Sequence, residues 1–302
     1  MDANLRPTLL CLSGLQGSGK TTRAHEWCAE DPAGRFRMNW DELRISMFGE
    51  DWKFNRPDED RMQQESVQMV LYSINAGKSV VVDNTNLTER AKEKWKNIAI
   101  AAGANFVQED VDTPVAECVR RDRARTGRAR VGRAVIERAA LTTGWIDWDD
   151  PIYPNQFVIV DMDGTWADCE HRRHHVIKTE DHPKKDWPAF FAGCPEDKVN
   201  QPVDQLVRML HSMAYGILVV SGRPIDLCGK QTEDWLNQHK VPYLHLFMRN
   251  GGDNRDDTEV KQEILDHLPK RRIWGCIDDR DRICKMWRDN GLFCLQVAEG
   301  DF

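Results

Sequence analysis

The chain of 302 residues lacks long hydrophobic runs, and none approaches the roughly 18 apolar residues that a membrane span needs. The segment from Met1 to Pro7 also lacks the basic and then apolar layout of a secretion signal, so we expect a cytoplasmic protein that binds no membrane. The nine cysteines include no C-x-x-C pair, which favours reduced, buried thiols over a disulfide framework. An internal repeat and a low-complexity tract are also absent, which argues against a repeat architecture.

The composition is that of a globular chain, with 40% hydrophobic and 30% charged residues. The formal net charge of −7 argues against general binding of polyanions. Basic residues are nevertheless concentrated in one segment, which could meet phosphate groups locally. Its eight arginines are Arg120, Arg121, Arg123, Arg125, Arg128, Arg130, Arg133 and Arg138.

Short apolar runs alternate with charged, helix-compatible stretches along the whole chain. The runs at 8–13, 79–82 and 157–160 are bounded by turn residues, as is typical of buried parallel strands. This alternation predicts the α/β class, with doubly wound parallel sheets. Pro151 and Pro154 interrupt the pattern, and we place a domain boundary near residue 153. The expected domains are therefore 1–153 and 154–302, each large enough for its own core.

A phosphate-binding loop follows the first expected strand. The segment Gly14–Thr21 matches G-x-x-x-x-G-K-[ST] and precedes a helix-compatible stretch, which is the context that this motif requires. Lys20 should reach the β- and γ-phosphates of ATP, and the Thr21 hydroxyl should bind Mg²⁺. The residues expected to contact the nucleotide here are Gly17, Ser18, Gly19, Lys20, Thr21 and Thr22.

The acceptor of this phosphate is suggested by polar residues at later strand ends. Asp41 follows a short expected strand, and a carboxylate there can accept a proton from a hydroxyl nucleophile. Arg44 lies one helical turn further and could hold a substrate phosphate. The same spacing also fits a helix-capping aspartate followed by a solvated arginine. Asp83 and Asn84, after the strand at 79–82, mark either a turn or the edge of the site.

Arg121 and Arg125 are four residues apart, which would place them on one face of a helix. Arginines of a lid can neutralise a transferring phosphoryl group, and Gly127 and Gly132 would make such a segment interrupted and mobile. A solvated helix face and a basic patch for nucleic acid are the alternatives.

A second phosphate motif, Asp161–Thr165, reads D-x-D-G-T at the end of the strand at 157–160. This is the signature of the haloacid-dehalogenase superfamily. The resemblance implies that Asp161 attacks phosphorus and that Asp163 acts as general acid and base, with Mg²⁺ at the carboxylates. The other motifs of the superfamily follow in order at Ser221, Gly222, Arg223, Lys261, Asp278 and Asp279. The metal ligands expected in this half are Asp161, Asp163, Asp278 and Asp279.

Four residues in the expected cap insertion, Cys169, His171, His174 and His175, suggest zinc, but their spacing fits no closed site well. A solvated or substrate-facing cap is the favoured alternative.

The two motif sets, in this order, resemble the bacteriophage type of bifunctional polynucleotide 5′-kinase/3′-phosphatase over essentially the whole chain. The resemblance implies a P-loop kinase domain followed by a haloacid-dehalogenase-like domain with a small cap. It implies transfer of the ATP γ-phosphate to 5′-hydroxyl ends of DNA or RNA, and removal of 3′-phosphate or 2′,3′-cyclic phosphate. Such ends are what a nucleic-acid ligase needs, so a ligase partner is expected. The formation of a homo-oligomer is left open.

The resemblance also assigns roles to single residues. Asp41 matches the general base of the kinase, Arg44 the arginine on the acceptor phosphate, and Arg121 and Arg125 the lid arginines. In the second half, the family positions required for dephosphorylation are matched by Arg223, Asp257, Lys261, Asp278 and Asp279, and Arg172 matches a substrate-side arginine.

The chain departs from the family in three places, one of which is the lengths of the kinase strands and helices between residues 45 and 78. The family's strand-end aspartate falls at Asn84 in strict register, and Asp83 stands one residue earlier. The cap region, Trp166 to Asn200, differs strongly. Two other functions are weighed beside end repair: a small-molecule kinase fused to a metabolite phosphatase, and an inactive nucleic-acid-binding scaffold. The paired carboxylates Asp161 and Asp163 argue against the scaffold, since a binding protein would not need them.

Overall fold

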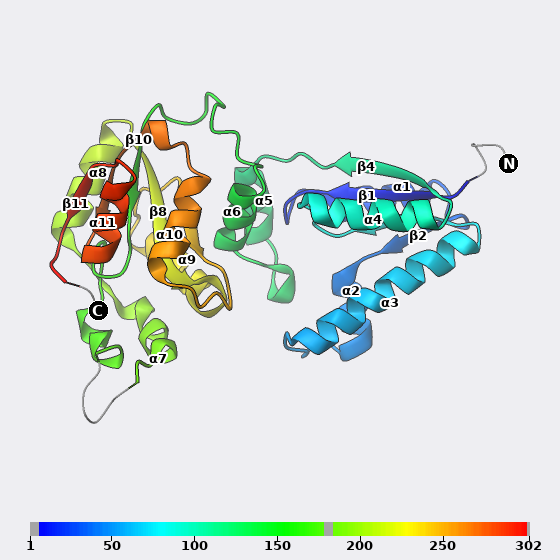
Figure 1. Ribbon diagram of the computed structural model, residues 1–302, viewed down its shortest axis with the longest axis horizontal. Coiled ribbons are helices and arrows are strands. Elements are labelled where there is room, and N and C mark those ends of the chain that lie inside the picture. Colours follow the sequence, from blue (N-terminus) through cyan, green and yellow to red (C-terminus); the bar gives the residue numbers. More distant parts are fainter. Residues whose placement is uncertain (1–5, 178–183, 301–302) are drawn as a thin grey trace. The chain divides into compact units, whose positions relative to one another are not determined.

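The computed structural model describes residues 6–177 and 184–300, and the chain divides into two compact units, Met1–Ala124 and Arg125–Phe302 (Figure 1). Part of the cap region (178–183) and the last two residues of the family resemblance, Asp301 and Phe302, lie outside the described residues. None of the helices in the described part combines the length and apolar character that a membrane span requires.

The N-terminal unit is built on a parallel sheet whose strands lie in the order β2-β3-β1-β4. The strands are β1 (Thr8–Ser13), β2 (Arg35–Met38), β3 (Ser79–Asp83) and β4 (Asn105–Asp110). The helices are α1 (Lys20–Ala29), α2 (Trp40–Phe48), α3 (Arg56–Asn75), α4 (Glu89–Ala101) and α5 (Val115–Arg123).

Side-chain alternation along β1 supplies both faces of this sheet. Leu9 and Cys11 pack in a core with residues of α3 and α4, whereas Leu10 and Leu12 pack with Ala24 of α1 on the other face. Strands that are buried on both faces read as continuous apolar runs, which is why this segment could be recognised as a strand from its sequence.

The C-terminal unit contains a second parallel sheet with the strand order β11-β10-β5-β8-β9. The strands are β5 (Phe157–Val160), β8 (Gly216–Pro224), β9 (His245–Arg249), β10 (Ile273–Asp278) and β11 (Cys294–Gln296). The helices are α6 (Arg133–Thr142), α8 (Gln201–Ser212), α9 (Ile225–Gln238), α10 (Asp257–Asp266) and α11 (Asp281–Asp289), with short 3-10 turns η2 (Gly127–Ala129) and η5 (Lys270–Arg272).

A small cap is inserted between β5 and α8. It contains the two-stranded antiparallel pair β6 (Ala167–Asp168) and β7 (Lys198–Val199), the helix α7 (Trp187–Ala192), and the 3-10 turns η3 (Glu170–His175) and η4 (Cys194–Glu196). The expected fold class, two parallel-sheet α/β domains with a small cap on the second, is confirmed.

The compact units divide between Ala124 and Arg125, earlier than the boundary expected near residue 153. The reason is α6, which packs on β9 and α9 and places Ala134 in the core of the C-terminal unit. The prolines indicated where the second sheet begins but gave no information about α6, whose partners β9 and α9 are distant in sequence.

Glu137 links α6 by hydrogen bonds to β9, which is one of the two edge strands of the sheet. It is 1% exposed, and its Oε2 accepts a hydrogen bond from the backbone N–H of Leu246 at 2.7 Å. Its Oε1 lies 2.9 Å from His245 Nδ1 and 2.9 Å from Arg133 Nε. Burial would raise the pKa of Glu137, but Arg133 and His245 hold it below its ordinary value. The carboxylate therefore pairs backbone and side-chain groups that would otherwise be buried without partners.

Replacing Glu137 with alanine should destabilise the C-terminal unit by about 2–4 kcal/mol, because it leaves buried donors unpaired. Urea unfolding of Glu137→Ala measures this free energy. The matched control is Glu259→Ala, at an exposed position of α10, which should change stability by no more than about 0.5 kcal/mol. Equal losses in the two variants would contradict the linking role of Glu137.

Candidate active sites

The phosphate-binding loop joins β1 to α1, as its motif predicts. Gly17 and Gly19 have φ angles of 85° and 107°, which favour glycine. A Cβ on Gly17 would lie 2.6 Å from the carbonyl oxygen of Cys118, so this position also needs glycine for space. The cradle that the motif requires is therefore present, and α1 begins directly after it, with Thr21 and Thr22 exposed in its first turn.

Lys20 folds back over this loop. Its Nζ donates to the carbonyl oxygens of Gly14 at 2.8 Å and Leu15 at 2.7 Å, and it lies 3.4 Å from Ser18 Oγ. The ammonium group thus lies next to the backbone of the loop, the position from which a P-loop lysine contacts bound phosphates.

The two arginines of the expected lid do not share a helix face. Arg121 lies on α5, and its Nη1 donates to Ser18 O at 3.1 Å, with Gly17 O at 3.4 Å. The helix α5 ends at Arg123, so Arg125 lies beyond it, where its Nη1 donates to Ala129 O at 3.4 Å. The i, i+4 interpretation was wrong, because the helix ends before its second member.

Asp41 and Arg44 do lie together on α2, with Asp41 Oδ1 2.5 Å from Arg44 Nη1. The alternative, a capping aspartate with a solvated arginine, is wrong on both counts. Asn39 caps α2, since its Oδ1 accepts from the N–H groups of Asp41 and Glu42 at 3.0 Å. Arg44 is fixed by Glu59, through Nε at 2.8 Å and Nη2 at 2.9 Å. The side chain of Asp41 is 87% exposed and therefore accessible to an acceptor.

Asp83 and Asn84 both hold the start of α2. Asp83 is buried and its Oδ2 pairs with Arg37 Nη2 at 2.7 Å, while its backbone oxygen accepts from Asn39 Nδ2. Asn84 Oδ1 accepts from the N–H of Trp40 at 2.9 Å. Asn84 Nδ2 is buried without a hydrogen-bond partner among the described residues. Both residues thus contact the segment at which α2 begins, directly before Asp41.

In the C-terminal unit, one lysine joins the ends of two strands. Asp161 directly follows β5, and Asp278 ends β10. Lys261 of α10, which is 1% exposed, donates from Nζ to Asp161 Oδ1 at 2.7 Å and to Asp278 Oδ2 at 2.8 Å. Burial opposes its charge, but the two carboxylates dominate and raise the pKa of Lys261, which keeps it an ammonium.

Asp161, Asp278 and Asp279 form a buried group whose ligand atoms all lie within 4.8 Å of one another. Burial, opposed by Lys261, raises the pKa of Asp161 well above its ordinary value. Burial and the neighbouring Asp278 raise the pKa of Asp279 to about 6. These shifts show a shortage of positive charge, which a divalent cation would relieve. Three carboxylates are the oxygen ligands that hard cations such as Mg²⁺ take, so the residues fit a metal.

The carboxylate of Asp163 is directed elsewhere, and so the fourth expected metal ligand is not in this group. Its Oδ1 accepts from Arg223 Nε at 2.9 Å and Nη2 at 2.5 Å, and from Arg172 Nη2. Burial would raise the pKa of Asp163, but Arg223 and Arg172 hold it well below its ordinary value. Asp161 and Asp163 therefore face different neighbours, as the turn at Gly164, with φ of 82°, permits.

The remaining expected residues border this centre. Ser221 Oγ accepts from the N–H of Arg223 at 3.3 Å. Gly222 lies against Asp257, because a Cβ on it would be 2.2 Å from Asp257 Oδ1. Asp257 Oδ2 in turn lies 3.1 Å from Arg280 Nη1.

Two residues of the centre, Asp197 and Arg280, were not expected from the sequence. Asp197 bridges Arg172 Nε at 2.7 Å and Arg223 Nη2 at 2.6 Å, and it is 3% exposed. Arg280 directly follows the Asp278–Asp279 pair. The position of Arg280 next to a carboxylate pair could have indicated that it belongs to the centre. Asp197 lies in the cap, far from any motif, so the sequence offered no such indication.

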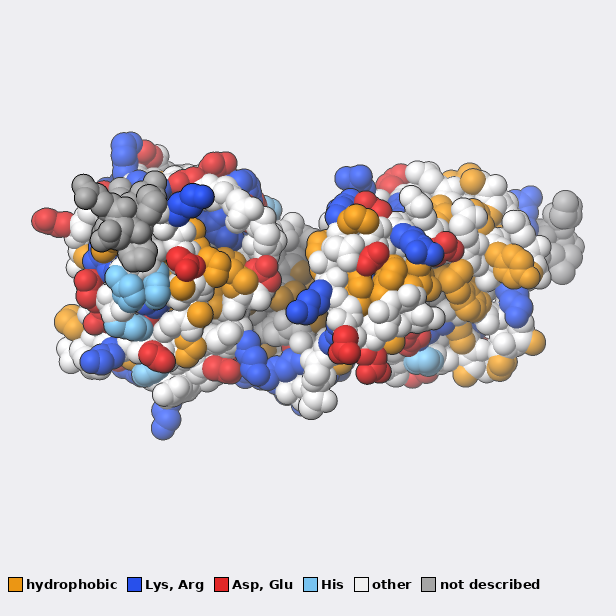
Figure 2. Space-filling view, turned by 90° about the horizontal axis from the view of Figure 1, so that it is seen from below, with side chains coloured by type: hydrophobic (Ala, Val, Ile, Leu, Met, Phe, Trp, Pro, Cys, Tyr) orange, Lys and Arg blue, Asp and Glu red, His pale blue; other side chains and the backbone are white. Residues whose placement is uncertain are grey.

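The expected zinc alternative finds no support in the residues that the structure describes, where Asp161, Asp278 and Asp279 are the group suited to a metal. Cys169 is 1% exposed, whereas the side chain of His171 is 41% exposed. One residue is therefore buried and the other lies at the surface. Figure 2 shows histidines gathered on the surface of the C-terminal unit.

The comparisons with known protein families match both halves of the chain. Residues 155–302 match the family described as the polynucleotide kinase PNKP phosphatase domain, and residues 9–142 match an AAA domain. The C-terminal part of the chain is thus a member of the polynucleotide kinase phosphatase-domain family. Domains of these two kinds imply the use of ATP and of a divalent metal in general.

One known protein that is similar to this chain is the putative bifunctional polynucleotide kinase/RNA ligase of Autographa californica nuclear polyhedrosis virus. It is 23% identical over 303 residues, which cover 93% of this chain and 41% of the relative, so the chain spans about two fifths of the relative's length.

Solved structures with a similar chain include that of the Pnkp1/Rnl/Hen1 RNA repair complex, at 25% identity and a TM-score of 0.42, covering 98% of this chain and 97% of that one. The Mycobacterium tuberculosis APS kinase CysC in complex with AMPPNP and APS is 23% identical, with a TM-score of 0.34, and covers 39% of this chain and 70% of its own.

Replacing Asp279 with asparagine should weaken binding of Mg²⁺ in the absence of nucleotide by at least about tenfold, because one charged ligand of the buried group is lost. Isothermal titration of the folded variant measures the dissociation constant. Asp289→Asn, at the exposed end of α11, is the matched control and should leave it unchanged. The same dissociation constant in Asp279→Asn and the wild type would show that the metal binds elsewhere.

Proposed function

We infer that this protein repairs broken nucleic-acid ends. It transfers the γ-phosphate of ATP to a 5′-hydroxyl and removes a 3′-phosphate, including one derived from a 2′,3′-cyclic phosphate. The observation that carries this proposal is the presence of two complete phosphate-handling centres in one chain. One is the loop Gly14–Thr21, and the other is the Asp161–Lys261–Asp278 group. The healed ends are the ones that a nucleic-acid ligase needs, so a ligase is the proposed partner.

In the kinase reaction, Lys20 and the loop hold the donor phosphates, while Arg121 lies beside the loop backbone. Asp41 accepts the proton of the 5′-hydroxyl as its oxygen attacks the γ-phosphorus and the bond to the β-phosphate oxygen breaks. Arg44, oriented by Glu59, holds the acceptor's first phosphate. The lid role of Arg125, which belongs to the C-terminal unit, stays a prediction.

In the phosphatase reaction, an oxygen of Asp161 attacks phosphorus and the bond to the 3′-oxygen breaks. Asp163 gives a proton to that oxygen, then takes one from the water that hydrolyses the aspartyl-phosphate. Asp163 is held as an anion by Arg172 and Arg223. A phosphate that draws these guanidinium groups away would raise its pKa and let it act as an acid. A bound Mg²⁺ at Asp161, Asp278 and Asp279 would reduce repulsion between carboxylates and phosphate.

A small-molecule kinase fused to a metabolite phosphatase is the alternative, and the match to the polynucleotide kinase phosphatase domain disfavours it. Transfer of labelled phosphate from ATP to a 5′-hydroxyl oligonucleotide, rather than to small hydroxyl compounds, separates the two.

The two activities should be lost independently, since Lys20 and Asp161 belong to different units. Lys20→Ala should abolish labelling of a 5′-hydroxyl oligonucleotide by ATP and leave release of 3′-phosphate intact. Asp161→Asn should do the reverse. Loss of both activities in either folded variant would refute the assignment of two sites.

Asp163→Asn should retain the nucleophile but lose the proton donor, and so slow the release of 3′-phosphate by about 10²- to 10⁴-fold. With p-nitrophenyl phosphate, whose leaving group needs little protonation, the variant should accumulate aspartyl-phosphate. Borohydride trapping and peptide mass spectrometry locate the adduct. A modified residue other than Asp161 would exclude the proposed nucleophile.

A further inference from the structure

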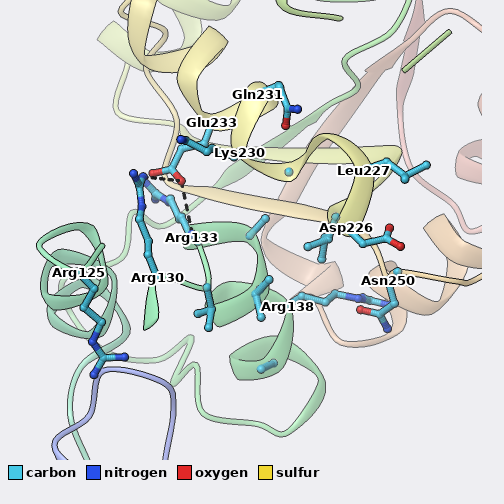
Figure 3. A pocket seen from close by; sticks show the side chains of 18 of the residues that line it. Arg125, Arg130, Arg133, Arg138, Asp226, Leu227, Lys230, Gln231, Glu233 and Asn250 are labelled. Carbon is cyan, nitrogen blue, oxygen red and sulfur yellow. Dashed lines mark hydrogen bonds and ion pairs between the residues drawn. The ribbon is translucent and has the colours of Figure 1, made fainter. Parts of the chain in front are cut away.

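A cavity of about 910 Å³ lies within the C-terminal unit, between α6, the start of α9 and the turn after β9 (Figure 3). The segment 125–135 and the turn Asn250–Gly251 complete its walls. Asp161, Lys261 and Asp278 do not line it, so the cavity is separate from the centre described above.

Arg138 lies against this cavity in an unusual environment. It is 2% exposed, and its Nη2 donates to Glu263 Oε1, whereas Nε and Nη1 have no hydrogen-bond partner among the described residues. Figure 3 shows its side chain extending toward Asn250. Buried guanidinium donors without acceptors are unfavourable, and burial accordingly lowers the pKa of Arg138 despite the nearby Glu263. Because both nitrogens are buried, an anion reaches them only after a small movement of the cavity wall, and it would then supply the missing acceptors.

The other charges around the cavity also favour an anion. Arg130, Arg133 and Lys230 line it together with two acidic residues, Asp226 and Glu233. Glu233 is buried, with its Oε2 3.4 Å from the N–H of Arg133 and 3.9 Å from Arg130 Nη2, as the dashed lines of Figure 3 mark. The negative charge of Glu233 is therefore already compensated by these groups of the cavity wall. Lys230 is exposed on α9 and available at the rim.

The cavity adjoins the phosphatase centre through the ends of two strands. Ile225, in its wall, directly follows β8, and Asn250 directly follows β9. Arg249, the last residue of β9, donates from Nε to Gly222 O at 2.9 Å and lies 3.3 Å from Asp257 Oδ1. Since parallel strands present their carboxyl ends at one edge, the cavity continues the edge on which the phosphatase centre lies.

We propose that this cavity binds a backbone phosphodiester of the strand whose 3′-phosphate occupies the phosphatase centre. The inference rests on the proposed function, and it narrows the substrate to oligonucleotides rather than nucleoside monophosphates. A single strand carries one phosphate for every nucleotide, so an end held at Asp161 brings further phosphates along the same edge. Arg138 offers two donors to such a group, and Lys230 adds charge at the rim.

The first test compares two substrates of the phosphatase. Arg138→Met should raise KM for a 3′-phosphorylated oligonucleotide by about tenfold, as the loss of a phosphate contact does, and leave kcat unchanged. Hydrolysis of p-nitrophenyl phosphate, which has no strand, should not change. Arg208→Met, at a partly exposed position of α8, is the matched control and should behave like the wild type with both substrates.

The second test does not depend on the folding of an Arg138 variant. Lys230→Ala, in an Asp161→Asn background that binds without turnover, should weaken binding of the oligonucleotide. The slope of log affinity against log salt concentration should fall by about 0.7, the value for one phosphate contact on a single strand. Fluorescence anisotropy measures both.

The outcomes separate this inference from the proposed function. Unchanged KM in folded Arg138→Met, together with an unchanged salt slope in Lys230→Ala, would overturn the inference. So would an equal loss with both substrates, because the cavity would then support the catalytic centre itself. If the wild type removed no 3′-phosphate but Lys230→Ala still weakened binding of the strand, the phosphatase assignment would fail and the binding site would stand.

Discussion

The C-terminal unit depends on the mutual neutralisation of charges that its sheet buries. Lys261 bridges Asp161 and Asp278, and without it two buried carboxylates would lose the ammonium group that both of them accept from. Arg172 and Arg223 serve Asp163 in the same way. Parallel strands make this arrangement possible because β5, β8 and β10 end at one edge, where chain segments distant in sequence deliver their polar residues. We propose that the same charges also bind the phosphate of the substrate.

The two units apply one physical solution to two reactions. Each ends a buried strand in a turn that needs glycine, at Gly17 and at Gly164, so that the backbone can pass close to a phosphate or a carboxylate. A buried lysine then stands at each strand end, Lys20 in one unit and Lys261 in the other. The proposed difference lies in the nucleophile: we propose that Asp161 attacks phosphorus itself, whereas Asp41 activates a hydroxyl of the substrate.

The sequence predicted the strands and the motifs because both are local. β1 and β5 have the expected bounds, since continuous apolar runs bounded by turns have few other interpretations. It could not predict contacts made across the sheet: Asp197 reaches Arg172 and Arg223 from the cap, and α6 packs on β9 through Glu137. Helix ends were also poorly defined, which is why Arg125 was wrongly placed on the helix of its neighbour.

The central claim, two opposite phosphate chemistries in one chain, is tested most directly on a single substrate. An oligonucleotide with a 5′-hydroxyl and a 3′-phosphate is incubated with the wild-type protein, ATP and Mg²⁺, and the mass of each terminal nucleotide is followed after nuclease digestion. The account predicts that the 5′ nucleotide gains a phosphate and the 3′ nucleotide loses one. An unchanged 5′ or 3′ terminal nucleotide, with the protein folded, would contradict it.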